Sequence, residues 1–220
     1  MKAVICKFIN AEKLKMHNKV FFVDLFGVLL GPDYSELIEY IFSKTNESKI
    51  NIYQKVFDEN SMKFFRREIS FETYFLMLQY KLLKGELVSK KKFNYYWNRM
   101  NIGATPVVDE FLRLKNKYKI YILTNTTTDH ILELKKKFNF IDQFSGIITS
   151  DLSKALKPNK AIFLYGLNLA QSKPQESVFI DDGFDNVNAA RKMGIIAHQY
   201  TNFKDFKIFL DKFLKELSSI

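Results

Sequence analysis

Four short apolar runs, each with a polar residue at or near its end, constrain the fold of this chain more than any other feature. They are VFFVDL (20–25), KIYILTN (119–125), GIITS (146–150) and SVFIDD (177–182). Their length and composition predict buried strands, and apolar residues recur at helical spacing between the later runs. Strands that alternate with helices form a parallel sheet covered on both faces. We therefore expect an α/β fold with a Rossmann-like parallel sheet as its core.

The segment 33–100 has a different pattern. Long amphipathic stretches such as FETYFLMLQYKLL fill it, and it contains no strong strand run. This pattern predicts an all-helical cap inserted after the first strand, where it would cover the carboxyl ends of the strands and exclude water from them. We expect the core to consist of residues 19–32 and 101–220. Residues 1–18 form a leader to which the sequence assigns no role.

The composition excludes several classes of protein. The single cysteine, Cys6, rules out an internal disulfide framework, and no stretch reaches the roughly 18 apolar residues that a membrane span needs. The first twenty residues mix apolar and charged positions too closely for a signal peptide, so we expect a cytoplasmic protein with no membrane partner. The net charge is +10, but the basic residues are scattered over amphipathic helical segments. Solvated helix faces explain this distribution, so we expect no nucleic-acid partner, and the oligomeric state stays open.

Polar residues gather where the predicted strands end. Asp24, Thr124 and the Asp181–Asp182 pair all fall at carboxyl ends, outside which the ligand site of a parallel α/β sheet lies. Burying an isolated carboxylate costs free energy, so Asp24 either caps a turn, pairs with a cation or takes part in chemistry. Two adjacent carboxylates facing Asp24 would repel it unless they are protonated or bridged by a cation. Mg²⁺, which prefers oxygen ligands, would relieve this repulsion.

Four segments of the chain occur in a characteristic order: FFVDLFGVLLG, YILTNTTTDH, the lysine of SKALKPNK, and SVFIDDGFDNVNAARKMGI. In this order and spacing they resemble the four motifs of the haloacid dehalogenase-like (HAD) hydrolase superfamily, in its helical-cap subclass. The similarity runs over about residues 20–200, nearly the whole chain.

The resemblance implies a hydrolase in which Asp24 is the nucleophile. A carboxylate can attack phosphorus or an activated carbon and form a covalent intermediate that water later opens. Lys157 would act with it in catalysis, by keeping Asp24 ionised and screening an anionic phosphate. Thr124 and Asn125 would bind the phosphate together with Lys157, through a hydroxyl and through backbone N–H groups ahead of a helix. Taken alone, Thr124 would be an ordinary helix cap and Lys157 a solvated lysine.

The resemblance also implies a Mg²⁺ site. Asp24, Asp182 and the backbone carbonyl of Phe26 would bind the ion, and Asp181 would either bind it or support its ligands. Water and substrate phosphate would complete the shell, as is common for Mg²⁺. Asn186 would hydrogen-bond a metal-bound water or the catalytic lysine, without binding the ion.

Phe26 departs from the superfamily pattern. In most phosphatases of the superfamily, the residue two positions after the nucleophile is an aspartate that protonates the leaving oxygen, whereas the haloacid dehalogenase branch commonly has an aromatic residue there. We expect a Mg²⁺-dependent phosphatase of a small phosphorylated metabolite, acting through an aspartyl-phosphate at Asp24. The alternatives are a 2-haloacid dehalogenase with the same nucleophile, or a binding protein that has lost turnover. The Asp181–Asp182 pair favours the phosphatase, because the dehalogenase branch usually carries serine and asparagine there.

Other conspicuous side chains are interpreted as structural. His130 lies at the start of a predicted helix, where a packed histidine is more common than a catalytic one. Core packing also explains the aromatic group Tyr95, Tyr96 and Trp97 better than a substrate pocket does. The sequence therefore predicts the chemistry of the site but not its substrate.

Overall fold

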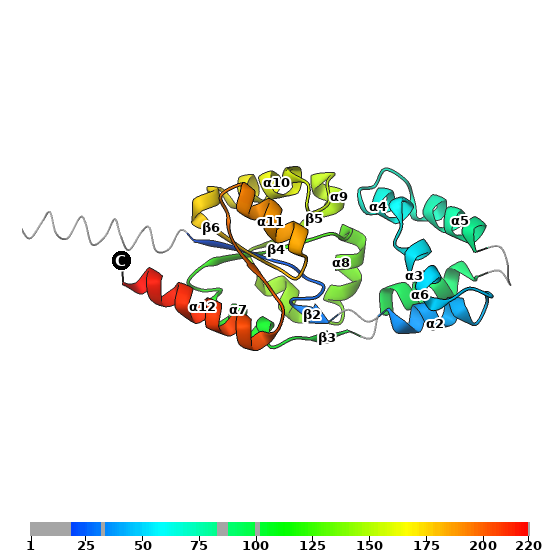
Figure 1. The fold of residues 1–220 in the computed structure, drawn as a ribbon, viewed down its shortest axis with the longest axis horizontal. Coiled ribbons are helices and arrows are strands. Elements are labelled where there is room, and N and C mark those ends of the chain that lie inside the picture. The colour runs from blue at the N-terminus through cyan, green and yellow to red at the C-terminus, as the bar shows by residue number, and fades with distance from the viewer. Residues whose placement is uncertain (1–18, 32–33, 83–87, 100–101, 220) are drawn as a thin grey trace, which may run out of the picture.

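The fold combines a parallel sheet, covered by helices on both faces, with a second group of helices at one end of it (Figure 1). The computed structural model describes residues 19–31, 34–82, 88–99 and 102–219. The leader 1–18 and the predicted cap boundaries at residues 33 and 100 therefore lie outside the described residues.

The sheet has the strand order β5-β4-β1-β6-β7, with every neighbouring pair parallel. Because β1 is central, its carboxyl end lies between those of β4 and β6, which follow it much later in the chain. The predicted α/β fold class is confirmed. The strands are β1 (Val20–Val23), β4 (Lys119–Thr124), β5 (Gly146–Thr149), β6 (Ser177–Asp181) and β7 (Ile196–Gln199).

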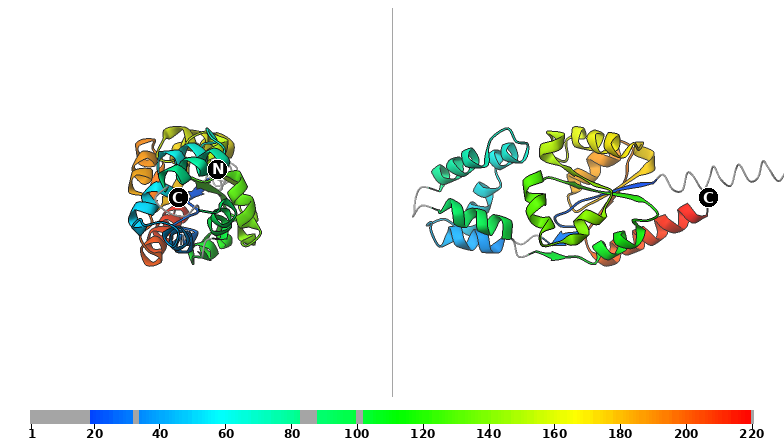
Figure 2. Two further views of the ribbon diagram at one scale, coloured as in Figure 1. Left: turned by 90° about the vertical axis from the view of Figure 1, so that its right-hand side faces the viewer. Right: turned by 180° about the vertical axis from the view of Figure 1, so that it is seen from behind.

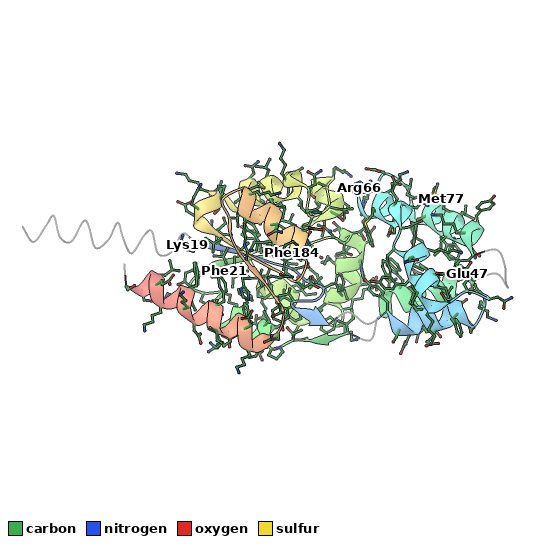
Figure 3. All side chains as sticks on the ribbon, viewed as in Figure 1. Lys19, Phe21, Glu47, Arg66, Met77 and Phe184 are labelled. Carbon is green, nitrogen blue, oxygen red and sulfur yellow. The ribbon has the colours of Figure 1, made fainter. Side chains whose placement is uncertain are left out.

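Alternating side chains of β1 divide the core into two layers. The helices that cover the sheet are α7 (Val107–Leu114), α8 (Thr128–Lys135), α9 (Ser150–Ser153), α10 (Lys160–Ala170), α11 (Phe184–Lys192) and α12 (Phe203–Ser218), with the 3-10 turns η1 (Asn139–Gln143) and η2 (Pro174–Glu176). Phe21 and Val23 pack with α7, α8 and α12, whereas Val20 and Phe22 pack with α10 and α11. Phe21, labelled in Figure 3, contacts the rings of Phe111 and Phe213 at 5.5 and 5.9 Å. Figures 1 and 2 show the two layers from opposite sides.

A cap of helices lies beyond the carboxyl ends of the strands (Figure 1). In the described part of the chain it consists of α2 (Ser35–Phe42), α3 (Lys49–Val56), α4 (Glu59–Phe65), α5 (Phe71–Lys81) and α6 (Lys90–Arg99). It has its own apolar core, in which Tyr74 and Phe93 are fully buried and Trp97 stacks on Phe93 at 5.5 Å. Tyr95 differs from its interpretation as a core residue, because α6 presents it to solvent, where it is 50% exposed.

Two short strands join the cap to the sheet. In β2 (Leu30–Gly31) and β3 (Gly103–Ala104) the chain leaves and re-enters the core as an antiparallel pair. Nothing in the sequence indicates these strands, because two-residue strands have no periodicity. No helix among the described residues is both long and apolar enough to cross a membrane.

Candidate active site

Three carboxylates meet where β1 and β6 end. Asp24 directly follows β1, and its backbone N–H donates to the carbonyl of Ile180 in β6 at 2.9 Å, so the two strands end side by side. Asp181 is the last residue of β6, and Asp182 follows it. Each of the three side chains offers one oxygen, and these oxygens lie within 4.8 Å of one another. Asp24 and Asp181 are buried, whereas Asp182 is exposed. Phe184, labelled in Figure 3, begins α11 just after this pair.

Lys157 supplies the positive charge of this cluster. Its Nζ lies 2.7 Å from Asp24 Oδ1 and 2.6 Å from Asp181 Oδ2, and it donates to the carbonyl of Leu123 at 3.0 Å. Burial alone lowers the pKa of Lys157, but the charges of Asp181 and Asp24 outweigh it, so the pKa lies above its ordinary value. Burial also raises the pKa of Asp24, an effect that Lys157 opposes. Lys157 is therefore a cation shared by two buried carboxyl groups.

Asn125 holds Lys157 in place. Its amide Nδ2 donates to the carbonyl of Lys157 at 3.0 Å, and the backbone N–H of Lys157 donates to Asn125 Oδ1 at 2.7 Å. This reciprocal pair joins the loop after β4 to the loop that carries the lysine. Because one N–H of the amide and its oxygen are engaged by Lys157, the donors left to Asn125 for the predicted contact with phosphate are its second amide N–H and its main chain.

Asp181 and Asp182 have different environments, although they are adjacent. Asp181 Oδ1 accepts from the N–H of Gly183 and from Asn186 Nδ2, both at 2.8 Å, and its Oδ2 accepts from Lys157. Asn186 thus binds Asp181, not the lysine. Burial and the charge of Asp181 raise the pKa of the more exposed Asp182. Asp182 is therefore the carboxylate of the pair that is open to a ligand.

The turn after β1 brings the main chain next to Asp182. Gly27 has a φ of +89°, and a Cβ built on it would lie 2.3 Å from Asp182 Oδ2. Only glycine adopts this conformation readily and leaves the room that the carboxylate occupies. An oxygen of Asp182 also lies within 4.8 Å of one oxygen each of Asp24 and Asp181, so three hard oxygen donors meet beside this turn. Their spacing and donor type fit a divalent cation, so the residues present match a Mg²⁺ site.

Thr124 and His130 lie on the same stretch of chain and each has a buried polar atom without a hydrogen-bond partner, Oγ1 and Nε2 respectively. Thr124 ends β4, the neighbour of β1. His130 Nδ1 lies 2.9 Å from Thr126 Oγ1, and burial lowers the pKa of His130 to about 4. Its ring stacks on Phe26 at 5.6 Å and lies 6.5 Å from Trp97 of the cap. Nothing in the local sequence indicates that His130 lies beside Phe26.

The similarities to known proteins agree with this geometry. A HAD family enzyme from Bacteroides thetaiotaomicron, solved with magnesium and inorganic phosphate, is 27% identical, with 82% of this chain and 93% of that chain covered and a TM-score of 0.67. L-2-haloacid dehalogenase from Xanthobacter autotrophicus shares the fold at 18% identity, 84% and 78% coverage and a TM-score of 0.63.

Among characterised proteins, a sesquiterpene phosphatase of Aspergillus oryzae is 28% identical over 83 residues, which are 38% of this chain and 42% of that protein. The match thus spans less than half of the fungal enzyme. Residues 18–194 match the family model "haloacid dehalogenase-like hydrolase". The predicted resemblance is confirmed: this chain belongs to the haloacid dehalogenase-like hydrolase family.

Proposed function

We propose that this protein is a Mg²⁺-dependent phosphatase that cleaves a small phosphorylated metabolite through an aspartyl-phosphate at Asp24. The observation that carries the proposal is the cluster itself, in which Lys157 lies 2.7 Å from Asp24 and two further carboxylates lie beside it. A dehalogenase that acts on carbon has no use for this concentration of negative charge. The relative solved with magnesium and phosphate, and the fungal phosphatase, support the same assignment.

Each residue of the cluster has a role in this proposal. Asp24 attacks phosphorus, and its Oδ1 is held by the N–H of Leu25 at 2.7 Å and by Lys157. Lys157 neutralises the anions that approach each other. The unpartnered hydroxyl of Thr124 and the main chain of Asn125 bind the phosphoryl oxygens. Mg²⁺, when bound, neutralises phosphoryl charge as a Lewis acid. Asp24, Asp182 and the backbone carbonyl of Phe26 would hold the ion, and Asp181 would support them through Lys157.

Phe26 favours a second candidate, a 2-haloacid dehalogenase. The aromatic ring two residues after Asp24 stacks on His130 and carries no proton for a leaving oxygen. A halide needs no such proton, so the same nucleophile would suffice on carbon. The fold likeness to L-2-haloacid dehalogenase is compatible with either reaction. The third possibility, a binding protein, would bind Mg²⁺ and phosphate without turnover.

The test measures phosphate release from a panel of phosphate esters with excess MgCl₂ or excess chelator, and halide release from 2-chloropropionate. We expect Mg²⁺-dependent phosphate release that Asp24→Asn abolishes. Asp109→Asn, which changes an exposed aspartate of α7, is the matched control and should leave activity unchanged. Halide release without metal would establish the second candidate, and phosphate release by the Asp24→Asn protein would refute the proposed nucleophile.

A further inference from the structure

The turn that follows α4 of the cap is bound to the core. Arg67 Nε lies 2.8 Å from Asp151 Oδ2 in α9, and Arg67 Nη2 lies 3.0 Å from Asp129 Oδ2 in α8. Two residues earlier, the carbonyl of Phe65 accepts from the hydroxyl of Ser150 at 2.8 Å. Figure 3 labels Arg66, the preceding residue, at this junction between α4 and the core. These contacts fix one corner of the cap over the sheet.

Asp151 connects this corner to the loop after β4. Its Oδ1 accepts from the backbone N–H and the hydroxyl of Thr128, at 3.0 and 3.1 Å, while its Oδ2 takes Arg67. The Asp151 side chain is only 2% exposed, so water contributes little to solvating its charge. Arg67 and the two hydrogen bonds from Thr128 stabilise the carboxylate instead. The single hydroxyl proton of Ser150 is shared between the carbonyls of Phe65 and Thr126, at 2.8 and 2.9 Å, and the backbone N–H of Ser150 donates to the carbonyl of Thr126 at 3.0 Å. Thr126 and Thr128 follow Thr124 closely in the chain, so these contacts join the cap to the segment that carries the proposed phosphate site.

The backbone at Arg67 is held in an uncommon conformation. Its φ is +56°, in the left-handed region where a residue with a Cβ is disfavoured by about 1 kcal/mol. Glycine is the usual residue at such a helix end. The N–H of Arg67 donates to Phe64 and that of Glu68 donates to Lys63, both at 2.9 Å, so the turn itself is complete with any side chain. The turn therefore does not require an arginine, whereas the ion pairs of Arg67 with Asp151 and Asp129 of the core, the bridge, do require one.

The neighbouring Arg66 provides an internal comparison. It pairs with Glu68, at 2.6 Å from Nε to Oε1 and 3.0 Å from Nη2 to Oε2, within the cap. Both arginines therefore have a carboxylate partner, but of the two only Arg67 pairs with carboxylates of the core. The two side chains have the same charge and length, and the residues are adjacent in the chain. A difference between variants at the two positions therefore measures the effect of the contacts between Arg67 and the core.

We propose that Arg67 is a positioning residue that couples the position of the cap to phosphate binding. With the cap docked, Arg67 holds Asp151, and Asp151 holds the start of α8 so that Thr124 and the loop after it face the phosphate. A phosphate in the site favours the docked cap for the same reason, because the coupling is reciprocal. The inference rests on the proposed function, which makes this loop the phosphate site.

The test compares Arg67→Met with Arg66→Met in the full-length protein, each with Mg²⁺. For Arg67→Met we expect a kcat lower by up to about a hundredfold, since small displacements of a positioned group have effects of that size. We also expect inorganic phosphate to inhibit this variant more weakly. In X-ray scattering, phosphate should decrease the radius of gyration of the native protein but not that of Arg67→Met. Arg67→Lys should restore part of each effect. Arg66→Met should behave like the native protein.

A double-variant cycle separates coupling from a general loss of stability. Asp151→Asn should weaken phosphate inhibition, and adding Arg67→Met to it should have little further effect, because each variant breaks the same bridge. Additive effects of the two substitutions would overturn the proposal, as would equal behaviour of the Arg66 and Arg67 variants. If the native protein cleaves no phosphate ester, the proposed function fails, but scattering with inorganic phosphate still decides the coupling. Phosphate that neither binds nor compacts the native protein would overturn both.

Discussion

At the scale of single residues, the site is built for charge and lacks an evident proton donor. Asp24, Lys157 and Asp181 form a buried ion cluster, in which one ammonium touches two carboxylates. Phe26 lies two residues after Asp24, and the ring that stacks on it, His130, is neutral at ordinary pH because burial lowers the pKa of His130 to about 4. These two rings therefore supply no acidic proton to the proposed reaction.

The first prediction concerns Phe26. Without a general acid, an enzyme favours leaving groups that are stable as anions, since acid catalysis is worth about two to four orders of magnitude. We expect the cleavage rate to fall steeply as the pKa of the leaving group rises across a series of aryl and alkyl phosphates. Phe26→Asp should flatten this dependence, and Phe26→Leu, which restores no acid, should keep it. A flat dependence in the native protein, with chemistry rate-limiting, would show that another group donates the proton.

The second prediction concerns the buried His130. Its folded pKa of about 4 lies below the ordinary value of 6.5, so between these values the unfolded chain binds a proton that the native chain excludes. The contribution of His130 to stability is therefore complete above pH 6.5 and falls toward pH 4, by at most about 1.4 kcal/mol per pH unit. Urea unfolding from neutral pH to about pH 4.5 should show a shallower decrease for His130→Phe than for the native protein. If the free energy of unfolding decreased equally with pH in both proteins, the pKa of His130 would not be lowered by folding, and its imidazole would be in contact with water.

At the scale of helices and strands, the sheet register explains how distant residues form one site. Val23 of β1 pairs with Ile122 of β4 and with Ile180 of β6, so the residues that follow each strand emerge at the same edge. The turn after β1 then reverses the chain toward Asp182, and it can do so because Gly27 adopts a positive φ. The geometry of the proposed metal site thus depends on one glycine that carries no functional group.

The third prediction tests this turn. In Gly27→Ala, the new Cβ would lie 2.3 Å from Asp182 Oδ2 at a φ that L residues rarely adopt, so the carboxylate must move. We expect the Mg²⁺ concentration for half-maximal activity to rise by about tenfold or more, as happens when groups supporting metal ligands are lost. The control is Gly103→Ala, whose Cβ would meet no atom within 4 Å. Equal Mg²⁺ requirements of the two variants would mean that Asp182 does not bind the metal from this position.

The elements also show what could be predicted from the sequence. The apolar composition of a run such as that around Phe22 is enough to predict a buried strand, and the order of the motifs predicts the family. Contacts between loops have no such signal. Asn125 and Lys157 are 32 residues apart and Arg67 and Asp129 are 62 apart, and nothing in the local pattern of either pair indicates its partner. The Arg67 bridge in particular depends on how the cap docks, which is a property of packing and not of any single segment.

At the scale of the whole molecule, two charge distributions act together. The chain carries a net charge of +10, which favours the approach of anionic substrates from solution. Within the site the balance is reversed, because Asp24, Asp181 and Asp182 face the single charge of Lys157. A bound divalent cation would cancel this local excess, so the folded protein should bind Mg²⁺ more tightly than its overall charge suggests. Stability and metal binding are therefore linked through the same carboxylates.

The last prediction uses Asp182→Asn to separate these two effects. Burial and the charge of Asp181 raise the pKa of Asp182, so ionised Asp182 at neutral pH makes the metal-free fold less stable. In excess chelator, Asp182→Asn should therefore unfold at a higher temperature than the native protein. With Mg²⁺ at about a hundred times its dissociation constant, the native protein should gain roughly 5–10 °C, whereas the variant should gain little. The order of the two melting temperatures thus reverses between chelator and Mg²⁺. Asp109→Asn, which should follow the native protein in both conditions, controls for the loss of a charge. Equal gains in Mg²⁺ for the Asp182 variant and the native protein would exclude Asp182 as a ligand, because a carboxylate that binds the ion must lose most of that stabilisation when it becomes an amide.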